Sequence, residues 1–175
     1  MKINRTNIPT YSLVNRYLPV NYTDTYSCIA KANSQITPDD ILVSFWTVMP
    51  KWVDNLFKIR NSIVKVLGLR TDNNDSFQEL EKCIRNGENY DFISIVDKSE
   101  NETVMLLSDK HLDAYLSVLI QDVGDGQQEI NVITLVKFHY WLGYLYFYTI
   151  LPFHHLVVKG MMKNTLKKLY ICNII

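Results

Sequence analysis

The hydrophobic pattern of the chain is strongest toward its C-terminal end. Residues 138–158, FHYWLGYLYFYTILPFHHLVV, contain no Asp, Glu, Lys or Arg. A segment of this kind has to be covered, because each Å² of apolar surface removed from water contributes about 25 cal/mol. We predict a long helix from Phe138 to Tyr170 that packs on a sheet made by the middle of the chain.

A membrane span is the alternative interpretation of this run, which has about the 20 residues needed to cross a bilayer. However, Pro152, three histidines and four tyrosines lie within it, and such residues are unfavourable at a bilayer centre. Beyond the run, Lys159, Lys163 and Lys167 recur every four residues, as on the exposed side of a half-buried helix. We therefore expect no transmembrane span.

Upstream, residues 22–34 are rich in β-branched and aromatic side chains and predict a first strand. Thr37-Pro38-Asp39-Asp40 then supplies a helix N-cap, a proline at the first position and two acids in the first turn. This helix should run to Met49, bend at Pro50 and continue as a second helix to about Gly68. Residues 1–20 show no sustained period and predict a tail or wrapping segment, followed by a single domain over 21–175.

The middle of the chain changes to a period of two. After a polar loop and a short helical turn over residues 76–87, four strand candidates are joined by short loops, which indicates antiparallel neighbours. They are Phe92–Val96, Thr103–Leu107, Leu112–Gln121 and Gln128–Tyr140. Apolar positions alternate in the last two, so we expect one face of each to support the final helix. Those faces are Leu112, Ala114, Leu116, Val118 and Ile120, and Ile130, Val132, Thr134, Val136 and Phe138.

The predicted order is strand, helix pair, antiparallel strands and long final helix, an α+β arrangement with a curved antiparallel sheet around a C-terminal helix. Four stretches carry a resemblance to a known family: YTDTY (22–26), MPKWVDNLFKIRNSIVKVLGL (49–69), DKHLDAYLSVLI (109–120) and residues 138–158. The order resembles the helix-grip (START-like, SRPBCC) superfamily of polyketide cyclases and lipid-transfer proteins. More narrowly, over about residues 19–170 the chain is similar to the bacterial domain-of-unknown-function family number 2867.

Composition narrows the classes of partner. The formal net charge is zero, with 18 basic and 18 acidic residues, which argues against nucleic acid. The three cysteines have neither disulfide-framework nor metal-ligand spacing, and no motif for a nucleotide, metal or cofactor occurs. The N-terminus has no apolar core of a secretion signal, so we expect a cytoplasmic protein with no cofactor.

The resemblance implies a cavity for a small apolar ligand or lipid between sheet and helix. Where the family usually has Phe after the HLD motif, this chain has Ala114, which would enlarge that cavity. We expect the ligand to be lined by Trp46, Ala114, Thr134, Phe138 and His154, with His154 meeting its polar end. Since His154 and His155 are adjacent on a helix, about 100° apart, at most one should face inward.

Two other functions stay open. The aromatic, lysine-flanked C-terminal segment could itself contact a membrane surface or a protein partner. A cyclase- or hydratase-like enzyme could use His111, Asp113 or His154, since a carboxylate beside an imidazole can support acid or base chemistry. His111 and Asp113 share a strand face opposite to Ala114, however, and a structural hydrogen-bonded motif is the simpler interpretation of that pair. No catalytic motif is found, so the sequence favours a binding protein over an enzyme.

Overall fold

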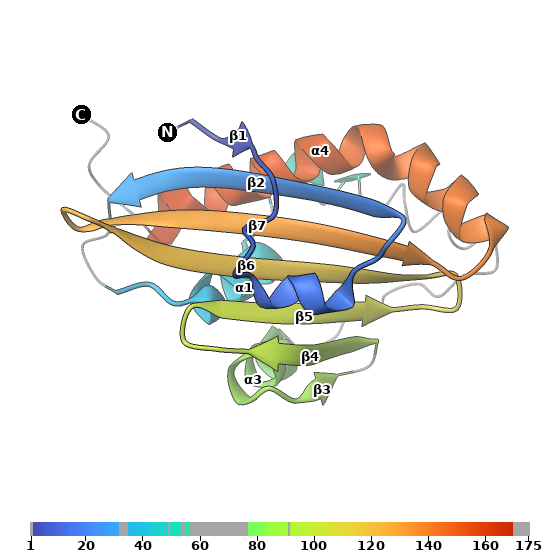
Figure 1. Ribbon diagram of the computed structural model, residues 1–175, viewed down its shortest axis with the longest axis horizontal. Helices are drawn as coiled ribbons and strands as arrows, with labels where there is room; N and C mark the ends of the chain where they lie inside the picture. Colours follow the sequence, from blue (N-terminus) through green and yellow to red (C-terminus); the bar gives the residue numbers. More distant parts are fainter. Residues whose placement is uncertain are drawn as a thin grey trace.

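Seven strands form one antiparallel sheet in a computed structural model, which describes residues 2–31, 35–48, 50–53, 55–56, 77–90 and 92–169. The spatial order of the strands is β1-β2-β7-β6-β5-β4-β3 (Figure 1). The strands are β1 (Asn4–Arg5), β2 (Tyr22–Lys31), β3 (Asn89–Tyr90), β4 (Ile93–Lys98), β5 (Glu102–Ser108), β6 (Leu112–Gly124) and β7 (Gln127–Phe138). The helices are η1 (Leu13–Tyr17, a 3-10 helix), α1 (Pro38–Thr47), α3 (Phe77–Asn86) and α4 (Trp141–Leu169).

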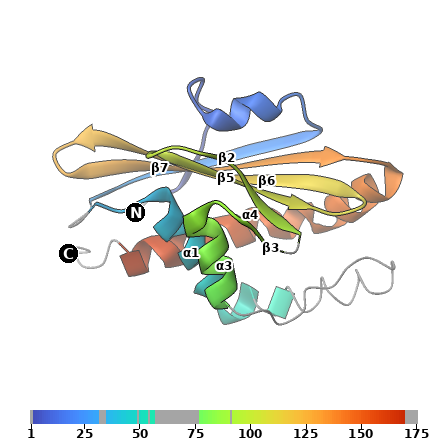
Figure 2. The same ribbon diagram turned by 90° about the horizontal axis from the view of Figure 1, so that it is seen from below.

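The sheet separates two layers of unequal size. Figure 2 shows α1, α3 and α4 on one face of the sheet and η1 alone on the other. The α+β class and the curved sheet with a long C-terminal helix are therefore confirmed, and the arrangement is consistent with a helix-grip fold. Most of the second helix predicted after Pro50 lies outside the described residues.

The predicted strands are present, with ends that differ by a few residues. Hairpins join β4 to β5, β5 to β6 and β6 to β7, whereas β2 pairs with β7 along all ten of its residues, from Tyr22 opposite Val136 to Lys31 opposite Gln127. Within the first 21 residues, where no regular element was predicted, the structure shows β1 and η1. The helical turn predicted over residues 76–87 is the ten-residue helix α3.

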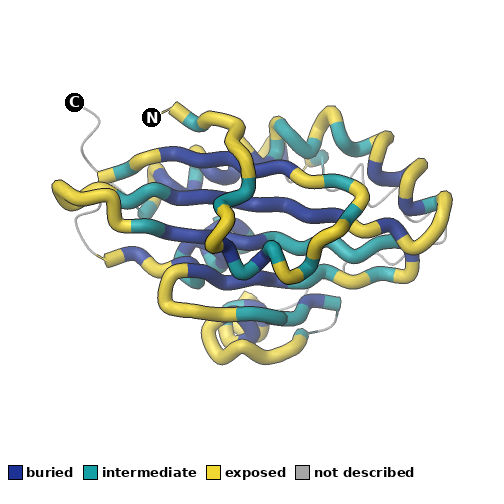
Figure 3. Tube along the Cα trace, in the orientation of Figure 1, coloured by how far each residue is buried: buried dark blue, intermediate teal, exposed yellow. Residues whose placement is uncertain are grey.

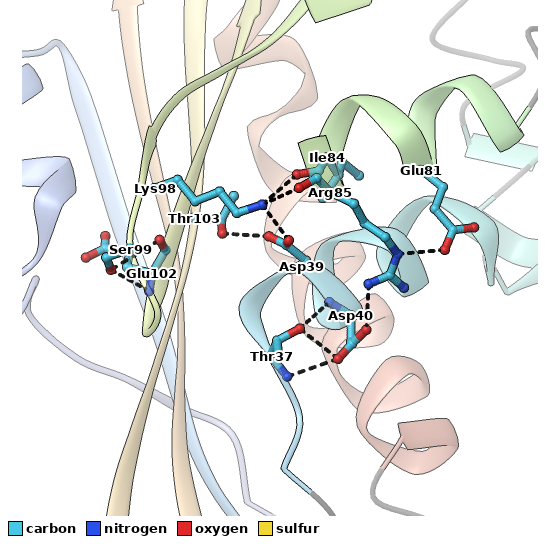
Figure 4. Close-up of polar contacts among 10 residues, drawn as sticks. All are labelled: Thr37, Asp39, Asp40, Glu81, Ile84, Arg85, Lys98, Ser99, Glu102 and Thr103. Carbon is cyan, nitrogen blue, oxygen red and sulfur yellow. Dashed lines mark hydrogen bonds and ion pairs between the residues drawn. The ribbon is translucent and has the colours of Figure 1, made fainter. Parts of the chain in front are cut away.

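The start of α1 is fixed by local capping and by ion pairs to its neighbours. The Thr37 hydroxyl accepts from the Asp40 N–H, and the Asp40 carboxylate accepts from the Thr37 N–H, so the predicted N-cap is one half of a capping box. Figure 4 shows Asp39 between Thr103 of β5, at 2.8 Å, and the Lys98 Nζ of β4, at 2.6 Å. The same Nζ donates to the last carbonyls of α3, so Lys98 ties both helices to the sheet.

The main core lies between the helices and the sheet. The faces predicted for β6 and β7 do support α4, since Val118, Ile120, Ile130 and Val132 pack in one cluster with Met161, Met162 and Leu166. Not every apolar residue of this helix faces the core. Leu156 is 59% exposed, whereas Val158 is buried.

A smaller core on the opposite face holds the N-terminal segment. Val14 of η1 packs with Val104, Ile133 and Leu135. Beside it, the buried carboxylate of Glu102 accepts hydrogen bonds from the hydroxyls of Ser12 and Ser117, both at 2.6 Å, and from the Leu13 N–H at 2.7 Å. Residues 12–17 are therefore attached to the sheet by one fully hydrogen-bonded acid.

Candidate functional site

A buried carboxylate lies at the centre of the polar group between β2 and α4. The side chain of Asp24 is 0% exposed, and its Oδ2 lies 2.8 Å from the Tyr22 hydroxyl and 3.0 Å from His154 Nε2. Because alternate residues of a strand share a face, Tyr22, Asp24 and Tyr26 of β2 all point toward the helix layer. A charge withdrawn from water requires partners of this kind.

Both histidines of α4 contribute to this group. His155 Nδ1 lies 2.8 Å from the Tyr26 hydroxyl and 3.5 Å from Asp24 Oδ2. The prediction that at most one of the two histidines faces inward considered the helix alone. Two residues of β2 contact one ring each, Asp24 that of His154 and Tyr26 that of His155. The His154 side chain is 17% exposed and that of His155 is 32% exposed, so the group reaches the surface through the histidines.

The surroundings set the charge of the group at neutral pH. Burial raises the pKa of the Asp24 carboxyl, but the hydrogen bonds from His154 and Tyr22, together with the nearby Thr134 hydroxyl, outweigh burial and hold the pKa below its ordinary value. Burial raises the pKa of the Tyr22 and Tyr26 phenols. Burial also lowers the pKa of the His155 imidazole, against the opposing attraction of Asp24. Asp24 is therefore ionised at neutral pH, and both phenols and His155 are neutral.

The second oxygen of Asp24 is underused. Among the described residues, Oδ1 has no hydrogen-bond partner of ordinary geometry, and neither does the hydroxyl of Thr134, which lies directly opposite Asp24 in the strand register. Buried carboxylate oxygens are rarely left in this state. The pair can therefore accept a donor from a third group, while the carboxylate orients His154 through Nε2 and leaves its Nδ1 for acid or base chemistry.

The predicted ligand-lining residues divide into two sets. Thr134 and His154 belong to the group around Asp24. Phe138 and Ala114 lie beside it, in a cluster built on Val136 and Phe147. Phe147 connects the two sets, since its ring centroid lies 4.7 Å from Tyr22 and 6.1 Å from His154.

Trp46, the fifth predicted lining residue, lies on α1 and packs against the main core. Its indole N–H, like Oδ1 of Asp24, has no partner among the described residues. Two hollows are found elsewhere on the described surface. One of about 490 Å³ lies between the start of α1 and the β6–β7 turn, and one of about 190 Å³ lies beside Tyr11 and Glu102; none of the predicted lining residues borders either hollow.

His111 and Asp113 have separate partners. His111 precedes β6 and its Nδ1 contacts the Tyr140 hydroxyl. Asp113 lies 3.0 Å from His139 Nε2 and accepts from the Ser108 hydroxyl at 2.7 Å. The two residues thus join the ends of β5, β6 and β7 to the start of α4.

Sequence reasoning missed Asp24, Tyr22, Tyr26 and His155 as members of the site. The signal was an acid between two tyrosines at a spacing of two, inside a strand whose other positions are apolar or small. Within the described residues, no group of three or more His, Cys, Asp or Glu is placed to hold a metal ion. Over the same residues, no helix is long and apolar enough to cross a membrane.

Comparison with known proteins identifies the chain at the level of a family. A search of curated proteins finds no match. The model of the family described as protein of unknown function (DUF2867) matches residues 17–161, which is most of the chain. The protein therefore belongs to this family.

Proposed function

We propose that the protein binds a small, largely apolar molecule or lipid between the sheet and α4, with a hydroxyl at the polar end of the ligand. The observation that carries the proposal is the ionised, fully buried Asp24, whose Oδ1 faces the Thr134 hydroxyl while neither atom has a hydrogen bond of ordinary geometry. The resemblance to START-like proteins supports the same location for a ligand. The proposal places this binding protein in the cytoplasm, as the sequence leads us to expect.

The negative charge of Asp24 determines which polar group of a ligand can bind beside it. A hydroxyl can donate to Oδ1 and accept from Thr134, which would satisfy both buried atoms at once. A carboxylate in the same position would lie against Asp24 and be repelled, because like charges in a poorly solvated site interact strongly. The ligand that fits is therefore an alcohol rather than an acid.

The apolar part of the ligand would lie on the neighbouring aromatic cluster. The rings of Phe138 and Phe147 lie 5.4 Å apart and Tyr22 covers Phe147. Ala114 is half-buried beside them, where its methyl group occupies less volume than the phenyl ring that the family resemblance implies at this position. Aromatic side chains of this kind line apolar binding sites in many proteins.

The test compares two probes that differ only in the polar end, 1-decanol and decanoate, by isothermal titration calorimetry at neutral pH. The proposal expects 1-decanol to bind more tightly. Asp24→Asn and Thr134→Val should each weaken 1-decanol about 5- to 100-fold, the range for a lost hydrogen bond in a dry site, whereas Thr23→Val, at the exposed neighbouring position of β2, should not.

Ala114→Phe tests the space itself. Filling a gap should abolish the binding of 1-decanol and leave the melting temperature unchanged or higher, because contacts are added without strain. A melting temperature lowered by many degrees would show that the space is already packed. Either that result, or equal binding of the two probes by the wild type, would contradict the proposal.

A further inference from the structure

The outward side of α4 is apolar where a helix on a protein surface is ordinarily polar. Its first four turns expose large apolar side chains, and Figure 3 shows exposed residues recurring along the helix. The exposed fractions are 68% for Trp141, 44% for Tyr144, 54% for Leu145, 54% for Tyr148, 51% for Phe153 and 59% for Leu156. We call these six residues the aromatic face of α4.

The aromatic face is continuous. At 100° per residue, Trp141, Leu145 and Tyr148 follow one another along one side of the helix, and Leu156 continues the same line. The buried residues Phe147 and Val158 lie on the other side, toward the sheet. Sixteen residues of helix span about 24 Å, and Phe153 lies at the border of the exposed side, about 60° from Leu156. The six side chains therefore form one patch rather than scattered exposures, and such patches mark interaction sites.

Positively charged residues follow the aromatic face on the same side of α4. Lys159, Lys163 and Lys167 follow Leu156 and are all exposed. No Asp or Glu occurs in the sequence after Glu129. The exposed side of α4 is therefore an aromatic half followed by a cationic half.

The helix is also accessible. Figure 1 shows the first half of α4 along the edge of the sheet where β2 lies, while α3 lies near the opposite edge, beside β3 and β4. The buried side of α4 is occupied by β7 and the main core. Within the described part of the chain, the aromatic face and the lysines of α4 are exposed.

We propose that α4 docks the protein on the surface of a bilayer that contains anionic lipids. Trp and Tyr side chains prefer the boundary between hydrocarbon and headgroups, and a helix with apolar and basic sides lies in the plane of that boundary. The lysines match the negative headgroups, and the sequence beyond Glu129 offers no acid that would oppose them. This docking is independent of whether a ligand binds at Asp24.

The test is co-flotation with vesicles at neutral pH. The wild type should float with vesicles of phosphatidylcholine and phosphatidylglycerol in a 7:3 ratio. It should float poorly with phosphatidylcholine alone, and its binding to the mixed vesicles should fall steeply as salt rises, since screening removes the attraction of lysines to the surface. This comparison needs no variant.

Two double variants test separately what the aromatic half and the lysine half of this surface contribute to vesicle binding. Trp141→Gln with Leu145→Gln should abolish flotation, and Lys163→Gln with Lys167→Gln should weaken partitioning about 30-fold, as for two lysines near an anionic surface. The control is Ile29→Gln with Lys31→Gln, an exposed apolar and basic pair on β2 whose side chains point to the opposite face of the sheet. It should float like the wild type.

Three results would overturn the proposal: no flotation of the wild type with anionic vesicles at low salt, equal flotation of both double variants and the control, or insensitivity to salt. Sedimentation velocity of the unbound protein provides a separate check. Self-association that is lost in the Trp141 and Leu145 double variant, without flotation of the wild type, would identify a second copy of this chain as the occupant instead.

Discussion

Removing the imidazole partner of Asp24 should destabilise the protein more than removing Asp24 itself. His154→Leu leaves a carboxylate that is 0% exposed, with the Tyr22 hydroxyl at 2.8 Å and His155 Nδ1 at 3.5 Å as its remaining partners. Removing a main partner of a buried charge costs about 3–5 kcal/mol, a large part of a typical stability of roughly 5–15 kcal/mol. We expect a loss in that range for His154→Leu at neutral pH.

The double variant decides whether the loss comes from the stranded charge. Asp24→Leu with His154→Leu removes both partners, so it should recover about 1–3 kcal/mol relative to His154→Leu alone, because no unpaired charge remains. The free energy of unfolding measured in urea gives all four corners of the cycle. Additive losses, or a His154→Leu loss below about 0.5 kcal/mol, would refute the role assigned to Asp24.

The pH dependence of the free energy of unfolding provides an independent test of the role of Asp24. In the wild type the folded-state pKa of Asp24 is lowered, so its contribution to stability is present above the unfolded value of about 3.9 and is lost as the pH falls through the folded value. In His154→Leu, burial would dominate and raise that pKa, so protonation should relieve the penalty. The deficit of the variant should therefore shrink as the pH falls from 7 toward about 4.

Three further predictions concern the rest of the fold. Gly143→Ala would place a Cβ 2.4 Å from the carbonyl oxygen of His111, so we expect a loss of about 1–3 kcal/mol in thermal unfolding although alanine favours a helix; an unchanged melting temperature would contradict that contact. Glu102→Ala should cost about 2–4 kcal/mol and expose the N-terminal segment to limited proteolysis, since three donors lose their acceptor; unchanged protection would contradict the attachment. The hydrogen bond that His139 donates to Asp113 raises the pKa of His139, so this contribution is present below about pH 6.5 and is lost as the pH rises through the raised pKa. Asp113→Asn should remove that dependence of the melting temperature between about pH 6 and 8, and an identical profile would refute it.

The sheet and α4 could be predicted because their signals are local. The alternation in residues 112–121 and 128–140 shows which side chains face the helices, and short loops set the antiparallel order. The N-terminal elements could not be predicted in this way. β1 is two residues long, and η1 is held by Val14 packing and by Glu102, a residue about ninety positions away, so the sequence around η1 has no period to detect.

The candidate site was predicted in part for a related reason. His154 was recognised from its own helix, but its partner Asp24 lies 130 positions away on a strand whose pairing with β7 had not been assigned. Sequence spacing favoured the near pair instead, His111 with Asp113. The structure gives these two residues separate partners because β6 begins at Leu112, so the alternation rule does not extend to His111.

The position of β2 beside β7 has a consequence for biosynthesis. β2 is the first long strand to be made, yet every residue of it pairs with a residue of β7 that is made 96 to 114 positions later. At 5–20 residues per second, β2 waits about 5–20 s on the ribosome for that partner. β4 to β7, joined by hairpins, can pair as they emerge. Asp24 therefore spends this interval in a nascent chain without the imidazoles of α4, and a chaperone that shields Tyr22–Lys31 would act during that interval.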